Sequence, residues 1–180
     1  MRSEIGYRGY FTLEIMHTAD GPREVLRGGD SACVLIYESV SRRAILVRQP
    51  RVTMIREDNP EGMLTEAVAG RFDAAYGVKE LIAKEAWEEA GVRLDEDRIE
   101  LLNNGEPVAL TAGATDERCY LAYAEVGPDD VEAGEHERGA EGEGEHITRV
   151  FVSADDLEGY VCEDARVYGL IQYLLRRLAV

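Results

Sequence analysis

Two neighbouring apolar segments constrain the fold of this chain more than any other feature. Residues 31–39, SACVLIYES, and residues 42–51, RRAILVRQPR, are rich in β-branched residues, and a short polar turn separates them. A strand whose successive residues are apolar is buried on both of its faces. We therefore expect these two segments to be adjacent strands at the centre of a sheet.

Two helices are expected to accompany this sheet. Residues 78–90 carry apolar side chains at helical spacing, and Gly91 follows them as a natural C-terminal cap. Residues 165–178 form the second predicted helix. Further strand-like segments are MLTEAVAG (63–70), IELLNN (99–104), EPVALT (106–111), CYLAYAEV (119–126) and ITRVFVS (147–153). Because strands and helices do not alternate strictly, we expect an α/β fold with a mixed sheet and helices on its faces.

The chain length of 180 residues predicts one globular domain, spanning residues 1–180. Before the central strands, residues 9–26 read as two short strands around the turn Ala19-Asp20-Gly21-Pro22. We therefore divide the domain into a β-hairpin arm over residues 1–30 and a core over residues 31–180. Residues 127–146 are rich in Gly and Glu and are predicted to be a loop.

The charge balance excludes some partners. The chain has 36 acidic and 20 basic residues, for a net charge of −16, so its field opposes nucleic acids and anionic membrane surfaces. No window approaches eighteen apolar residues, which argues against a membrane span. The three cysteines are far apart in the sequence and show no paired spacing, which indicates a reduced, cytoplasmic setting.

Three carboxylates lie close together on the first predicted helix. Glu85, Glu88 and Glu89 are three and four positions apart, so they share one face within about one turn. Their mutual repulsion costs a few tenths of a kcal/mol for each like-charged pair, roughly. A solvated acidic face beside Lys84 explains them without any function, whereas a hard divalent metal ion would explain why they are grouped.

The spacing around this helix resembles the Nudix box, G-x5-E-x7-R-E-U-x-E-E-x-G-U, in which U is a bulky aliphatic residue. Gly70, Glu85, the pair Glu88 and Glu89, and the closing Gly91-Val92 all fall in register. Two positions depart from the box: Tyr76 replaces a glutamate, and Lys84 replaces the arginine. In the family these two residues resemble a salt-bridged brace, so losing both leaves no buried orphan charge.

Segments outside the box look like the branch of nucleoside-diphosphate-sugar pyrophosphatases that act on ADP-ribose or GDP-mannose. They are REVLRGGDSACVLIY (23–37), AILVRQPR (44–51), TAGATDE (111–117) and EGEGEHI (141–147). The resemblance implies a Nudix α/β/α sandwich, Mg²⁺ as cofactor with Mn²⁺ as the alternative, and a nucleoside diphosphate sugar as substrate. It also implies a homodimer in which the N-terminal arms exchange between subunits.

The resemblance also assigns roles to individual residues. The metal ligands would be the carbonyl of Ala69 with Glu85, Glu88, Glu89 and a late-loop glutamate, Glu143. The catalytic set would be Glu143, Glu141 and Glu88, with Glu143 as the base that orients water and Glu141 and Glu145 as its rivals. The alternative is that the late acidic residues only keep that loop solvated.

Substrate contacts are expected at the ends of two strands and in one loop. Arg48 and Arg51 could clamp phosphate in a bidentate manner, with Arg51 preferred and the other arginine structural. Glu66 resembles a position near the nucleotide, and Thr115 belongs to a loop that would touch the sugar. Trp87 is expected to pack in the core.

Two functions from different classes remain open on the sequence alone. The first is a Mg²⁺-dependent hydrolase that splits a nucleotide sugar into a nucleoside monophosphate and a sugar phosphate. The second is a catalytically weak or inactive sensor on the same fold, which the departures at Tyr76 and Lys84 motivate.

Overall fold

Strand β4 (Ser31–Glu38) is buried along all eight of its residues, which confirms a central strand that is covered on both faces. The computed structural model describes residues 2–134, 137–138 and 146–179. Alternate side chains of β4 enter two separate apolar clusters. Ala32, Val34 and Ile36 join one cluster, and Cys33, Leu35 and Tyr37 join the other.

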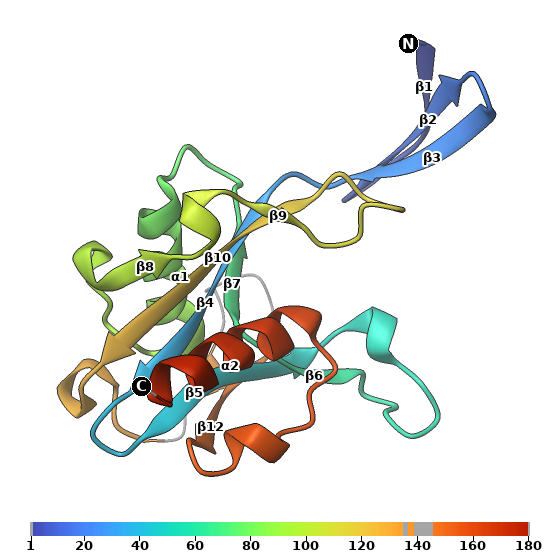
Figure 1. Ribbon diagram of the computed structural model, residues 1–180. Coiled ribbons are helices and arrows are strands. Elements are labelled where there is room, and N and C mark those ends of the chain that lie inside the picture. The colour runs from blue at the N-terminus through green and yellow to red at the C-terminus, as the bar shows by residue number, and fades with distance from the viewer. Residues whose placement is uncertain (1, 135–136, 139–145, 180) are drawn as a thin grey trace.

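A mixed sheet forms the body of the molecule (Figure 1). Besides β4, its strands are β5 (Arg43–Pro50), β6 (Met63–Glu66), β7 (Val68–Arg71), β8 (Ile99–Leu101), β9 (Val108–Ala109), β10 (Arg118–Val126), β11 (Glu137–Arg138) and β12 (Ile147–Ser153). The strand order is β11-β12-β5-β4-β10-β8, in which β10 pairs with β4 in parallel and β4 pairs with β5 in antiparallel orientation. Short 3₁₀ helices connect them at Val52–Met54, Glu96–Arg98, Asn103–Gly105, Pro128–Asp130 and Leu157–Gly159.

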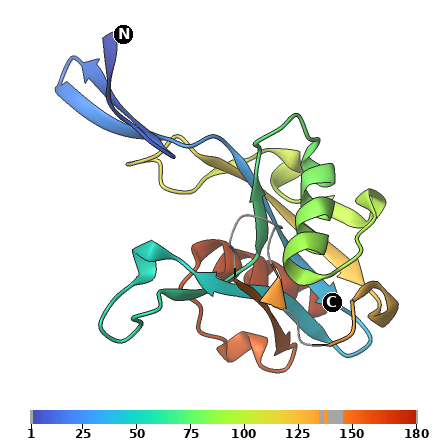
Figure 2. The same ribbon diagram turned by 180° about the vertical axis from the view of Figure 1, so that it is seen from behind.

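Helices α1 (Val78–Ala90) and α2 (Ala165–Leu178) cover opposite faces of the sheet, and both have the predicted bounds. Figure 1 shows α2 in front of the sheet, and Figure 2 shows α1 in front after the half turn. Helix α1 ends at Gly91, whose φ of 63° is left-handed, as expected of a glycine cap. Helix α2 begins at Asp164, whose carboxylate accepts the backbone N–H of Arg166.

Strands β4 and β5 pair over only three residues on each and then separate. Residues Ile36–Glu38 of β4 pair with Arg43–Ile45 of β5. Beyond this point β7 pairs with the first half of β4, and β6 pairs with the second half of β5. The segment MLTEAVAG therefore forms two strands that belong to two different neighbours, whereas the sequence predicted one strand.

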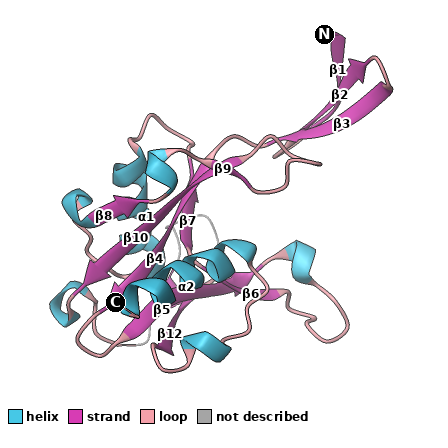
Figure 3. Ribbon diagram, viewed as in Figure 1, coloured by secondary structure: helices cyan, strands magenta, loops and turns pink. Residues whose placement is uncertain are grey.

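The N-terminal arm is a three-stranded antiparallel sheet that extends away from the body (Figures 1 and 3). The predicted hairpin is confirmed as β2 (Thr12–Thr18) and β3 (Gly21–Arg27). Strand β1 (Arg2–Arg8) was not predicted, because all seven of its residues are exposed and it lacks an apolar pattern. The body contacts the arm at its base, where Leu26 N–H donates to the carbonyl of Ala114 at 2.9 Å.

Other differences from the sequence prediction are local. Within EPVALT only Val108–Ala109 forms a strand, and IELLNN leaves the sheet after Leu101. The thiols of Cys33 and Cys119 are buried, and their sulfur atoms lie 3.7 Å apart although 86 residues separate them in the sequence. None of the helices formed by the described residues is long and apolar enough to cross a membrane.

Replacing Gly91 with alanine tests the left-handed cap of α1. A Cβ in the left-handed region costs about 1 kcal/mol, so Gly91→Ala should lower the free energy of unfolding by about that amount in urea denaturation. Gly159→Ala is the control, because it has open space around its Cα and a φ outside the left-handed region. Equal stabilities for the two variants would contradict the cap assignment.

Candidate active site

A cleft of about 430 Å³ lies between the end of β5, strand β7 and helix α1. It is lined by Tyr10, Arg51, Ala69, Gly70, Arg71, Asp73, Lys84, Glu85, Glu88 and Glu89. Five predicted site residues therefore meet in one place. The three glutamates come from one face of α1, whereas Ala69 lies on β7 and Arg51 directly follows β5, the two strands that take new partners where β4 and β5 separate.

Gly70 allows Glu85 to lie against the backbone of β7. A Cβ built at Gly70 would overlap the carboxylate and Cγ of Glu85, so glycine leaves room for that side chain in the position it occupies. Glu85 is largely shielded from water, with 16% of its side chain exposed. The box glycine and the first helical glutamate thus form a matched pair across the cleft.

Glu89 is tied to the neighbouring residue of the same strand. It is buried, and its Oε2 accepts the backbone N–H of Ala69 at 3.0 Å. In an antiparallel pair, two opposite residues either exchange both backbone hydrogen bonds or neither. Because the N–H of Ala69 points away from its partner Cys33, its carbonyl also points away from β4, on the side of Glu89. A carboxylate and a carbonyl oxygen are therefore directed into the same region.

Lys84 lies against two of the three carboxylates. Its Nζ is 2.6 Å from Oε2 of Glu88 and 3.3 Å from Oε1 of Glu85. Burial lowers the pKa of Lys84, but the hydrogen bond to Glu88 and the charge of Glu85 outweigh it and raise the pKa above its ordinary value. The side chain is therefore a permanent ammonium at neutral pH.

Arg51 is held at the cleft by a chain of buried charges. Its Nε donates to Oε2 of Glu66 at 2.6 Å, and Arg166 donates to Oε1 of the same carboxylate at 2.8 Å. Arg166 also contacts Asp164, the N-cap of α2. Glu66, predicted to lie near the nucleotide, is 4% exposed and links β6 to α2. It positions Arg51, and its predicted nucleotide contact stays a prediction.

Two other predicted substrate residues do not line this cleft. Arg48 is exposed on β5, and Thr115 lies at the base of the arm, bridged to Leu26. The hydroxyl of Thr115 accepts the backbone N–H of Glu117 at 3.1 Å. The predicted catalytic residues Glu141 and Glu143, and their rival Glu145, lie outside the described residues.

The sequence did not single out three further residues that line the cleft, namely Arg71, Asp73 and Tyr10. The guanidinium of Arg71 lies over the rings of Phe11 and Tyr10, at 5.0 and 5.3 Å from their centres. A basic residue directly after the box glycine was a usable signal for Arg71. Tyr10 carried no such signal, because only the folded arm brings it near β7.

Two aromatic residues of the box segment, Tyr76 and Trp87, have different surroundings. Tyr76 packs against the apolar cluster beneath α1, and it lines a hollow of about 550 Å³ with Phe72 and Tyr120. Trp87, expected in the core, is instead 38% exposed, and Arg93 lies over its ring at 5.2 Å. Position 87 points out of the helix face that Ala86 and Ala90 bury.

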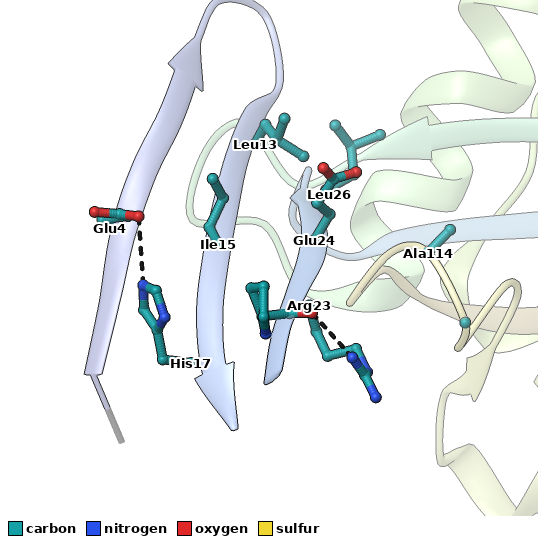
Figure 4. Close-up of a pocket in the computed structure, with 10 residues that line it drawn as sticks. Glu4, Leu13, Ile15, His17, Arg23, Glu24, Leu26 and Ala114 are labelled. Carbon is teal, nitrogen blue, oxygen red and sulfur yellow. Dashed lines mark hydrogen bonds and ion pairs between the residues drawn. The ribbon is translucent and has the colours of Figure 1, made fainter. Parts of the chain in front are cut away.

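A larger hollow, of about 790 Å³, lies between the arm and the loop that carries Gly113 and Ala114 (Figure 4). Leu13, Ile15 and Leu26 line it together with Glu4 and His17, which contact each other at 3.3 Å. It shares no lining residue with the cleft at α1, and its two carboxylates, Glu4 and Glu24, come from different strands of the arm rather than from one helix face. The chemistry therefore points to the smaller cleft.

Comparison with known proteins finds relatives over most of the chain. It is similar to the GDP-mannose pyrophosphatase of Cronobacter sakazakii, with 33% identity over 159 residues, covering 86% of this chain and 78% of the relative. The corresponding enzyme of Pectobacterium atrosepticum is 44% identical over 103 residues, covering 57% and 50%. The uridine diphosphate glucose pyrophosphatase NUDT14 of Mus musculus is 28% identical over 166 residues, covering 76% and 71%. A scan against protein-family models gives no match.

Removing Arg166 tests the buried charge chain behind Arg51. Arg166→Met should lower the free energy of unfolding by about 3 kcal/mol, because two largely buried carboxylates lose their shared partner. The second substitution Glu66→Gln should restore part of this loss. Arg177→Met is the control on the same helix, since its ion pair with Glu100 is 46% exposed on both sides and is worth about 1 kcal/mol or less. Similar losses of stability in Arg166→Met and Arg177→Met, measured by urea denaturation, would contradict the stabilising role of the buried ion pairs behind Arg51.

Proposed function

The chain belongs to the Nudix family of nucleotide-sugar pyrophosphatases, and from this premise we propose that it uses Mg²⁺ to hydrolyse a nucleoside diphosphate sugar of the GDP-mannose or ADP-ribose type. The products are a nucleoside monophosphate and a sugar phosphate. The observation that carries the proposal is the cleft in which Ala69, Gly70 and three glutamates of α1 face Arg51 and Arg71. In the same proposal, the sheet between α1 and α2 is the Nudix α/β/α sandwich.

The residues present fit a hard divalent metal ion. Mg²⁺ and Mn²⁺ prefer carboxylate and carbonyl oxygens, and Glu85, Glu88, Glu89 and the carbonyl of Ala69 supply both kinds. The ammonium of Lys84 already lies against two of these carboxylates, so a positive charge is stabilised at this position. Within the described part of the chain, no three His, Cys, Asp or Glu side chains are grouped so as to hold a metal as they stand. Metal binding in our proposal therefore requires side chains to rearrange.

The cations of the cleft bind the diphosphate in this proposal. Arg51, fixed by Glu66, and Arg71, fixed over Tyr10 and Phe11, present guanidinium groups that match phosphate oxygens. When bound, a divalent metal supplies charge neutralisation on the diphosphate and an activated water. Glu88, or Glu143 or Glu141 of the late loop, would accept the proton of the attacking water. Arg48 and Thr115 remain proposed contacts to the substrate.

We also propose that the protein is a homodimer joined through its arms. Strand β1 is exposed along its length, and Ile5, Tyr7 and Tyr10 present apolar surface, with Tyr10 84% exposed. The arm extends from the body and leaves a large hollow beside it (Figures 1 and 4). A second copy would cover both features through an isologous interface.

A substrate panel tests the reaction. The purified protein should convert at least one of GDP-mannose, UDP-glucose and ADP-ribose in the presence of Mg²⁺, and the products should release inorganic phosphate after treatment with a phosphatase. Glu85→Gln and Glu89→Gln should each abolish turnover without loss of folding, because they remove carboxylate ligands.

The control for these variants is Glu80→Gln on the same helix. Its carboxylate caps the N–H of Gly77 at 3.1 Å and does not line the cleft, so turnover should be retained. The absence of products from every substrate would refute the proposed function. Full activity in both cleft variants would refute the metal assignment.

Light scattering tests the dimer. The wild type should elute at about twice the 20.0 kDa mass of the chain. Tyr7→Asp, which places a charge on the exposed face of β1, should shift the protein to a monomer, whereas Tyr168→Asp, at an equally exposed site on α2, should not. A monomeric wild type would rule the arm interface out.

A further inference from the structure

Lys84 contacts the carboxylates of the cleft from within the helix that carries them. Its ammonium reaches both Glu85 and Glu88. The exposed fractions of the three side chains are 34%, 16% and 32%, so water only partly screens these ion pairs. These ion pairs are therefore stronger than an ion pair on a fully exposed helix surface.

Helix geometry by itself favours only part of this arrangement, because Glu88 lies four residues beyond Lys84 whereas Glu85 is adjacent to it. Adjacent residues on a helix do not normally face each other, yet Lys84 reaches its immediate neighbour Glu85. In the pair with Glu88 the cation is N-terminal to the anion, which is the weaker order on a helix. The attraction therefore comes from the grouped carboxylates, whose like charges an ammonium relieves.

No carboxylate at position 76 competes for the Lys84 side chain. Tyr76 ends the loop that leads into α1, and it packs with Phe72 against the apolar cluster beneath the helix. An aromatic side chain at this position holds the loop by apolar contact and offers no charge to an ammonium. Lys84 is thus directed to the side of the helix that carries Glu85 and Glu88.

We propose that Lys84 is a tethered cation that competes with the divalent metal for Glu85 and Glu88. The inference rests on the proposed function, in which these carboxylates hold the metal. An ammonium and a divalent ion cannot share the same carboxylate oxygens, because like charges a few ångströms apart repel strongly where water is partly excluded. Metal binding therefore displaces Lys84, and the residue lowers the affinity of the protein for the metal.

Calorimetric titration of Mn²⁺ into the full chain, without substrate, measures this competition directly. Lys84→Met removes the charge and keeps most of the side-chain volume, and it should tighten Mn²⁺ binding by about threefold to tenfold. Lys84→Arg keeps the charge and should bind within about twofold of the wild type. Lys79→Met is the matched control, because Lys79 lies on the same helix, donates to the carbonyl of Glu96 and does not line the cleft.

Thermal unfolding gives a second readout that activity does not affect. Without metal, Lys84→Met should melt below the wild type, because the repulsion between Glu85 and Glu88 is no longer relieved. With saturating Mn²⁺ its melting temperature should rise by more than that of the wild type. A lower melting temperature without metal and a larger rise with it would together support the competition.

The outcomes separate this inference from the proposed function. If the wild type binds Mn²⁺ and hydrolyses a nucleotide sugar, but Lys84→Met binds no more tightly than Lys79→Met, only the competition is overturned. If neither the wild type nor Lys84→Met binds Mn²⁺, both proposals fail. Binding that is detectable only in Lys84→Met would support the competition in its strongest form.

Discussion

Burial of β4 on both faces is the constraint on which the rest of the structure depends. Its alternate side chains fill two apolar clusters, and each cluster requires a helix as its cover. Helix α1 covers one face and α2 the other. Glu85, Glu88 and Glu89 lie beside the apolar residues through which α1 packs on the sheet. The packing of α1 therefore also places three carboxylates next to the first half of β4 and its neighbour β7.

The separation of β4 from β5 converts this layered body into a site. Once the two strands part, β7 pairs with β4 and leaves its other edge open to α1. The free N–H of Ala69 then meets Glu89, and Gly70 leaves space for Glu85. The same separation gives β5 a new partner in β6, whose Glu66 holds Arg51. The separation of β4 from β5 thus places both the glutamates and Arg51 at the cleft.

Features with local causes were predictable from the sequence, whereas features with distant causes were not. The bounds of α1 and α2 follow from helical spacing and from the cap at Gly91, all within a few residues. The glutamates and Ala69 were placed by fixed spacing. By contrast, the link from Glu66 to Arg166 spans 100 residues, and the contact of Cys33 with Cys119 spans 86. Strand β1 has only two large apolar residues, Ile5 and Tyr7, and both are exposed, so its pattern carried little signal.

Tyr76 and Lys84 show how two substitutions in one motif can compensate each other. A lysine at position 84 with an acidic partner at position 76 would be drawn toward the loop, whereas a lysine opposite an aromatic residue is drawn to the nearest remaining negative charge. That charge is the pair Glu85 and Glu88, whose repulsion the ammonium relieves. The helix therefore tolerates three close carboxylates without any bound ion. In our proposal, a metal ion would have to displace this side chain, so the two departures would affect metal binding more than folding.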